Sequence, residues 1–163
     1  MTVDRSSQHP RGPWPGLVVG VDGSAPSQRA LGWALGIAPR LGVGVLALQV
    51  SDDVYTAAEK GFCTRGQAEE WTAQARSDGL TMLSRQLDEL GYEPGEPEVE
   101  LEVVPGQPAE VLLRRSSAAE MLVLGPRGLG RLRQVLGSVS RTCLQHATCP
   151  VVIVPDTDGE RRG

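Results

Sequence analysis

The sequence predicts an α/β fold, in which a mostly parallel sheet is covered by helices on both faces. Short apolar, β-branched runs alternate along the chain with longer segments whose apolar residues recur at helical spacing. Parallel strands need crossover connections, and helices supply right-handed ones. The chain has 163 residues, 40% of them hydrophobic, which is enough for one domain with a substantial core.

The first part of the chain predicts two strands joined by a helix. Residues 17–21 form a β-branched run and predict the first strand. Ser24 or Ser27 can cap the helix that follows, whose apolar residues recur at helical spacing until Gly42 ends it. A second apolar run at 43–50 predicts the second strand, and the alternation of the α/β pattern begins here.

The middle of the chain predicts a long helix and a strand at the sheet edge. Residues 51–66 are predicted as an unusually long, mobile connection. Residues 67–90 show the apolar spacing of a helix, which Gly79 weakens without abolishing. Residues 98–104 alternate between apolar and charged side chains, as a strand half exposed to water does, and are therefore predicted to lie at an edge.

The last part of the chain continues the alternation. Residues 106–120 predict a third helix with Pro108 in its first turn, and 121–124 a short buried strand. Residues 138–146 predict a fourth helix, and the apolar run 151–154 a last strand. Strands and helices thus alternate to the end, which favours a parallel sheet with both faces covered.

Composition and termini limit the class of protein. Residues 1–15 and 156–163 are rich in proline, serine or charge and are predicted to be flexible tails around one domain, 16–155. The first residues lack the apolar core of a signal peptide, and no later run is long enough to span a bilayer, which predicts a soluble, cytoplasmic protein without membrane partners. The net charge of −4 gives no indication that the protein binds nucleic acid. The cysteines form neither a CxxC pair nor an even set and are predicted to be reduced packing residues: Cys63, Cys143 and Cys149.

A glycine-rich stretch, LGPRGLGRLRQVLGSVS at 124–140, follows the predicted fourth strand. It is not a Walker A loop, because Arg131 stands where that motif has lysine, and the third glycine of a dinucleotide fingerprint is missing. What remains is Gly125 with Gly128, a spacer, and then Gly137 followed by Ser138 at a helix start. Free N–H groups at such a helix start suit an anion.

Asp22 and this glycine stretch follow two different predicted strands. Ligands of open parallel sheets bind beyond the carboxyl ends of the strands, where the strand order reverses. If the first and fourth strands are neighbours there, Asp22 and the glycines face one crevice. Structural roles remain open alternatives: Asp22 can cap a turn, Ser138 can cap a helix, and Gly137 can be a turn glycine.

Three segments together resemble the universal stress protein family: LVVGVDGSAPSQRALGWALGIA, PGQPAEVLLRRSSAAEMLVLG and GPRGLGRLRQVLGSVSRTCLQHATCPVVIVP, within residues 16–155. The resemblance implies a five-stranded parallel, Rossmann-like fold that dimerises through its last strand, here 151–154. It also implies a regulator in the stress response rather than a fast enzyme. Many members of the family bind ATP or AMP, and Mg²⁺ can accompany the nucleotide.

Carried over by position, the resemblance assigns the ribose to Asp22 and the adenine pocket to Val50, and the phosphates to Gly125, Gly128, Gly137, Ser138 and Val139. Two features depart from the ATP-binding pattern. The spacer 129–136 is one residue shorter than usual, and Pro126 removes one backbone N–H. Weaker nucleotide binding is therefore expected. A dimeric scaffold without nucleotide, or a slow ATPase using Asp22 with Asp52 or Asp53, are the alternatives.

Overall fold

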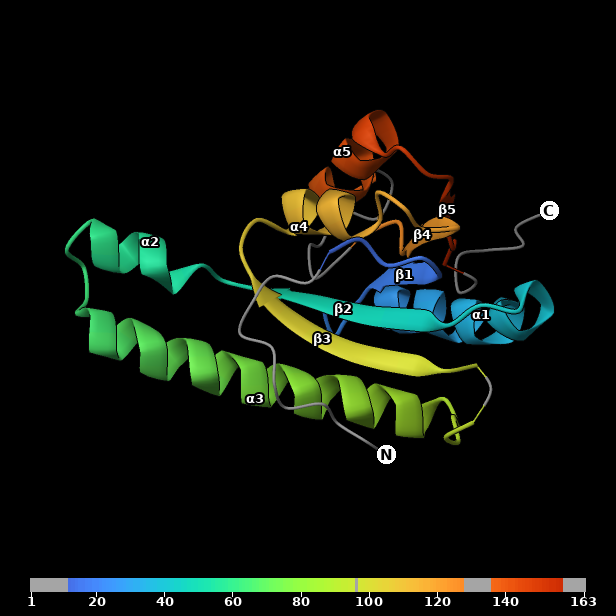
Figure 1. The fold of residues 1–163 in the computed structure, drawn as a ribbon, viewed down its shortest axis with the longest axis horizontal. Coiled ribbons are helices and arrows are strands. Elements are labelled where there is room, and N and C mark those ends of the chain that lie inside the picture. The colour runs from blue at the N-terminus through green and yellow to red at the C-terminus, as the bar shows by residue number, and fades with distance from the viewer. Residues whose placement is uncertain (1–11, 96, 128–135, 157–163) are drawn as a thin grey trace.

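A five-stranded sheet forms the centre of the computed structural model, which describes residues 12–95, 97–127 and 136–156. All neighbouring strands pair in parallel, which confirms the predicted fold class. The strands are β1 (Leu17–Gly20), β2 (Val45–Ser51), β3 (Val99–Pro105), β4 (Met121–Leu124) and β5 (Val151–Ile153). Their order is β3-β2-β1-β4-β5, so the order reverses between β1 and β4 (Figure 1).

Helices cover both faces of this sheet (Figure 1). They are α1 (Ala25–Leu41), α2 (Val54–Glu59), α3 (Arg65–Glu89), α4 (Pro108–Arg115) and α5 (Ser138–His146). Leu17 and Val19 of β1 point into a core shared with α1 and α3, whereas Val18 points into a second core shared with α4 and α5. Side chains of a strand alternate between faces, so the continuous apolar run of β1 serves both cores.

The segment 51–66, predicted as a long connection, contains α2 and the start of α3. The Asp53 side chain caps α2 by accepting from the Tyr55 N–H at 3.1 Å. Thr64 and Gln67 form a reciprocal capping box at the start of α3, with distances of 2.9 and 3.2 Å. Apolar periodicity missed α2 because none of its residues is buried.

Several elements end earlier than the sequence predicts: β1, α3 and β5 by one residue, and α4 by five. The third predicted helix, 106–120, stops at Arg115, and the hydroxyls of Ser116 and Ser117 then donate to preceding carbonyls at 3.4 and 3.0 Å. β5 stops at Ile153, although the Val154 N–H still donates to the Leu124 carbonyl at 2.9 Å. The ladder between β4 and β5 therefore continues almost to the end of the predicted strand.

The borders of the domain also contact its core. The Trp14 N–H donates to the Arg115 carbonyl at 2.8 Å, and the Trp14 side chain packs against the second core. Residues 1–11 and 157–163 of the predicted tails lie outside the described residues. In the ranges that the structure describes, no helix is both long and apolar enough to cross a bilayer.

Candidate functional site

The carboxyl ends of β1 and β4 lie side by side at the same end of the sheet. Their parallel register pairs Val19 with Val123, so the segments that leave the two strands start from the same edge. β1 continues through Asp22 into α1 on one face, and β4 continues through Gly125 towards α5 on the other. The first and fourth strands are thus neighbours, as the shared crevice requires, and they form the reversal point at which open α/β sheets bind ligands.

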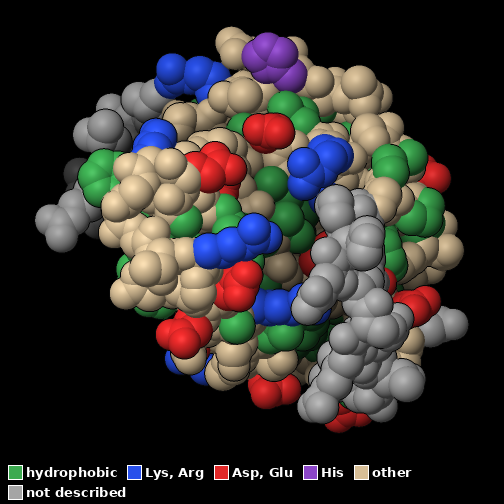
Figure 2. Space-filling view, turned by 60° about the vertical axis from the view of Figure 1, so that its left-hand side comes forward, with side chains coloured by type: hydrophobic (Ala, Val, Ile, Leu, Met, Phe, Trp, Pro, Cys, Tyr) green, Lys and Arg blue, Asp and Glu red, His purple; other side chains and the backbone are tan. Residues whose placement is uncertain are grey.

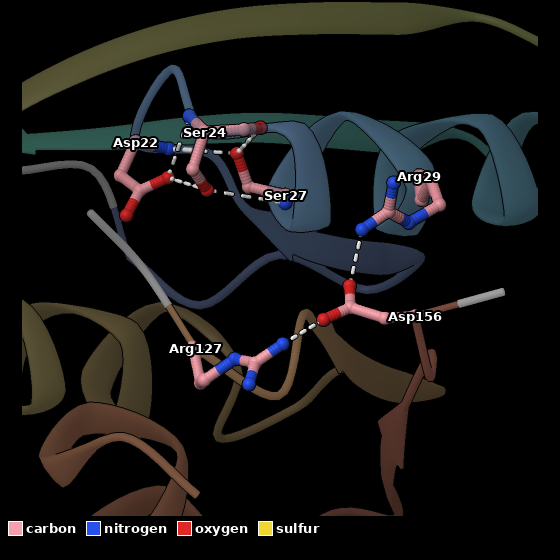
Figure 3. A network of polar contacts seen from close by, with 6 residues as sticks. All are labelled: Asp22, Ser24, Ser27, Arg29, Arg127 and Asp156. Carbon is pink, nitrogen blue, oxygen red and sulfur yellow. Dashed lines mark hydrogen bonds and ion pairs between the residues drawn. The ribbon is translucent and has the colours of Figure 1, made fainter. Parts of the chain in front are cut away.

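Asp22 lies in the turn between β1 and α1, with its side chain exposed. Its Oδ1 accepts from the Ser24 backbone N–H at 3.0 Å and from the Ser24 hydroxyl at 2.5 Å. Its own N–H donates to the Ser27 hydroxyl at 3.2 Å, and Ser24 caps α1 (Figure 3). Asp22 thus holds the turn with Oδ1, and Oδ2 makes no hydrogen bond within the described residues.

Gly125 is a glycine for a structural reason. A Cβ there would lie 2.9 Å from two atoms of Pro26, because the backbone after β4 packs directly on the first turn of α1. The Gly125 carbonyl accepts from the Ser140 hydroxyl at 2.9 Å, which ties the same residue to α5. Gly125 therefore fixes the distance between the starts of the two helices that flank the crevice.

The ends of the glycine stretch are joined by a backbone hydrogen bond. The Gly137 N–H donates to the Pro126 carbonyl at 2.9 Å, so the chain returns to the sheet edge before α5 begins. This bond uses the Gly137 N–H, which is then not available to a phosphate. Gly128, the other predicted phosphate contact in this stretch, lies outside the described residues.

The start of α5 provides hydrogen-bond donors at the crevice. Gly137, not Ser138, is the N-cap residue, and no side chain caps the helix. The first backbone N–H groups of α5 therefore lack helical partners, as they do in any helix. The Ser138 side chain is exposed, whereas the Val139 side chain packs into the second core and offers the site its backbone only. Donors at a helix start favour an anion.

Val50 lies near the end of β2, beside β1 on the side away from β4. Its side chain is half-buried and packs against the second core. The Ser51 carbonyl just beyond it accepts from the Gly106 N–H at 3.0 Å. Val50 thus lies at the same end of the sheet as Asp22, with its side chain packed on the second core.

Sequence reasoning missed one feature of this end of the sheet, a network of two ion pairs that share one carboxylate. Asp156, just beyond β5, pairs through Oδ1 with Arg29 of α1 and through Oδ2 with Arg127 of the glycine stretch (Figure 3). Partial desolvation alone would raise the pKa of the Asp156 carboxyl, but the hydrogen bonds and charges of Arg29 and Arg127 outweigh it and lower that pKa. The signal was hidden because Asp156 falls in a segment with a tail-like composition.

Charges of both signs are mixed over this end of the molecule. Figure 2 shows Lys and Arg side chains interspersed with Asp, Glu and apolar ones, without a continuous basic surface on the described part of this face. Among the described residues, no group of three or more His, Cys, Asp or Glu is placed to hold a metal ion. The local features that favour an anion are therefore the start of α5 and the arginines that flank Asp156.

Comparison with curated proteins places the chain in a family. The sequence profile of the universal stress protein family matches residues 16–155. Universal stress protein Rv2623 of Mycobacterium tuberculosis is 33% identical over 144 residues, which cover 86% of this chain and 45% of that protein. The chain thus spans about half the length of the curated relatives that it matches.

Solved structures share the fold. The universal stress protein UspA from Lactobacillus plantarum is 21% identical with a TM-score of 0.65, covering 88% of this chain and 99% of that one. A universal stress protein in complex with cAMP is 24% identical (TM-score 0.59; 88% and 98% covered). The Archaeoglobus fulgidus universal stress protein in complex with dAMP is 20% identical (TM-score 0.54; 86% and 97% covered). From its family profile and its curated relatives, the chain belongs to the universal stress protein family.

Proposed function

We propose that the protein is an adenine-nucleotide-binding regulator of a stress response, acting in the cytoplasm without catalysing a reaction. The observation that carries this proposal is the convergence of Asp22, the ends of the glycine stretch and the start of α5 at the reversal point of the sheet. Two structural neighbours, which are complexes with cAMP and with dAMP, support an adenine nucleotide as the ligand class.

Each part of the site suits one part of a nucleotide. The Oδ2 of Asp22 is an acceptor for ribose hydroxyls, while Oδ1 keeps the turn in place. Val50 offers apolar surface for adenine. The N–H groups at the start of α5, including that of Val139, and the hydroxyl of Ser138 are donors for phosphate oxygens. In this proposal Gly125 positions the loop. The Gly137 N–H is already used by the Pro126 carbonyl, so Gly137 contributes only close backbone approach to the phosphate.

A dimeric scaffold without bound nucleotide is the second candidate, and a specific observation favours it. Asp22, Gly125 and Gly137 each have a structural role that needs no ligand: a turn, a close packing contact and a loop closure. Binding of AMP, or of ATP with Mg²⁺, distinguishes the nucleotide-binding regulator from the scaffold. Slow ATP hydrolysis ranks third, and we assign no catalytic residue.

Dimerisation is proposed under both candidates. β5 lies at the end of the sheet, and in the described chain it pairs only with β4. Its three residues and Val154 are apolar and half-buried. An apolar strand with one unpaired side is a ready template for a second strand. We therefore propose a homodimer in which residues 151–154 of two copies lie side by side.

Calorimetric titration of nucleotide-free protein with adenosine, AMP and ATP tests the nucleotide site. Asp22→Asn keeps an Oδ1 acceptor for the turn but loses the carboxylate, so we expect roughly tenfold weaker binding of all three ligands. Ser138→Ala removes a phosphate donor only. It should weaken AMP and ATP by roughly tenfold and leave adenosine unchanged.

Ser77→Ala, a matched change on the exposed surface of α3, is the control and should bind all three ligands like the parent. Binding that the Asp22 and Ser138 variants do not alter would move the nucleotide elsewhere on the molecule. Absence of any heat at millimolar nucleotide, with the fold intact, would leave the scaffold as the better description.

A further inference from the structure

Arg127 lies within the proposed phosphate loop, yet its guanidinium is engaged by a carboxylate of the chain itself. The residue is two positions after Gly125, and its Nη2 pairs with Oδ2 of Asp156. A guanidinium fork binds carboxylate and phosphate oxygens through the same N–H groups. A nucleotide phosphate that binds through Nη2 of Arg127 would therefore displace Asp156 from it.

The exchange does not isolate the charge of Asp156. Arg29 pairs with Oδ1 of Asp156 independently of Arg127, so the carboxylate keeps a cationic partner when Arg127 leaves. Figure 3 shows Arg29 and Arg127 reaching Asp156 from α1 and from the loop. The exposed fractions of the Arg29, Arg127 and Asp156 side chains are 29%, 19% and 21%, so solvent screens these charges only in part.

Asp156 is also held in position by the sheet. The Val154 N–H, two residues earlier, donates to the Leu124 carbonyl at 2.9 Å, and Gly125 follows directly on β4. The segment after β5 and the start of the glycine stretch thus lie side by side. The carboxylate is tethered at a high local concentration relative to any anion in solution.

We propose that Asp156 is an internal competitor of nucleotide phosphate: a tethered carboxylate that occupies Arg127 and releases it to the phosphate when nucleotide binds. This inference rests on the proposed nucleotide site. It adds a regulatory contact, because the segment after β5 then sets the affinity for phosphorylated ligands and changes its own contacts when they bind. A change at the proposed dimer strand is thereby linked to the phosphate loop.

Titration of four proteins with adenosine, AMP and ATP tests the competition. Asp156→Asn removes the competing charge and should tighten ATP by roughly three- to tenfold, AMP by less and adenosine not at all. Arg127→Gln should weaken ATP. The double variant should bind ATP no more tightly than Arg127→Gln alone, because the gain acts through Arg127.

Asp78→Asn, which removes the same charge from the exposed surface of α3, controls for net charge and should leave every affinity unchanged. Thermal unfolding of each variant checks the fold. If the parent binds ATP and Asp156→Asn binds it equally or more weakly, the competition is wrong while the nucleotide site stands. If the gain persists without Arg127, the competition is also wrong. If no protein binds any ligand, both proposals fail.

Discussion

The two edges of the sheet solve the problem of an unpaired strand in opposite ways. β3 is seven residues long, and Glu100 and Glu102 alternate in it with apolar residues that face α3. β5 is three residues long and wholly apolar. Charge on a long edge strand discourages pairing with another chain, whereas an uncharged apolar edge permits it.

The difference extends to what each edge is fastened to. At β3, the buried guanidinium of Arg115 on α4 donates to Oε2 of Glu102 through Nε at 3.0 Å and Nη2 at 2.6 Å. At β5, the charged residue Asp156 contacts the glycine stretch instead. The β3 edge is therefore tied into the core, and the β5 edge is tied to the candidate site.

Breaking the ion pair under β3 should have the largest effect. The exposed fraction of the Arg115 side chain is 2% and that of Glu102 is 16%, so Arg115→Met leaves a largely buried carboxylate without its partner. We expect the free energy of unfolding to fall by about 3–5 kcal/mol in urea titrations. Adding Glu102→Leu should restore most of it, because the unpaired charge is then gone. Equal losses in the single and double variants would contradict this explanation.

A charge placed on the β5 edge should separate the proposed dimer. In a twofold interface Val152→Lys brings two ammonium groups into an apolar contact. The dimer dissociation constant should rise at least about 100-fold, about 2.7 kcal/mol, in sedimentation experiments. Glu98→Lys, an exposed change beside the start of β3, is the matched control and should leave the oligomeric state unchanged. A dimer that tolerates Val152→Lys would locate the interface elsewhere.

The close packing of α3 on the β3 edge gives a smaller effect. A Cβ on Gly79 would lie 2.2 Å from Gln49 Oε1 and 2.7 Å from Val103 Cγ2. Gly79→Ala should therefore lower the free energy of unfolding by about 1–3 kcal/mol, although alanine favours the helix. Gly36→Ala in α1, with no heavy atom within 4 Å of the new Cβ, should raise it by about 0.5–1 kcal/mol. Two variants that change stability in the same direction would exclude packing as the cause.

The strands were predictable because their signal is local. Val18 and Leu122 belong to apolar runs that any parallel sheet needs, and the alternation of Glu100 and Glu102 with apolar residues marked β3 as an edge. α2 was missed because it buries nothing. Gly79 was taken as a weakness of a helix, whereas its reason is a tertiary contact with β2 and β3 that no local pattern contains.

For the candidate site, the sequence singled out Asp22 and the glycines but not their contacts. Asp22 and the glycines are visible in the sequence because they interrupt apolar runs. That Gly137 gives its N–H to Pro126, and that Asp156 reaches Arg127, depend on which segments the sheet brings together. Sequence neighbours carry no information about a contact between residues 29 positions apart.

The smallest expected effect is the pH dependence contributed by the β5 end. Arg29 and Arg127 hold the pKa of Asp156 below its ordinary value against partial desolvation. A carboxyl with a lowered folded pKa stabilises the fold above its unfolded pKa, about 3.9, and this contribution is lost as the pH falls through the folded pKa. Asp156→Asn should therefore lower the free energy of unfolding by about 0.5–1 kcal/mol at pH 7, and the difference from the parent should fade towards pH 2. In an Arg29→Gln background the effect of Asp156→Asn should shrink, because one of the two guanidinium partners is gone. A difference that stays constant from pH 7 to pH 2 would show that the Asp156 charge does not stabilise this edge, and that the amide acts through packing alone.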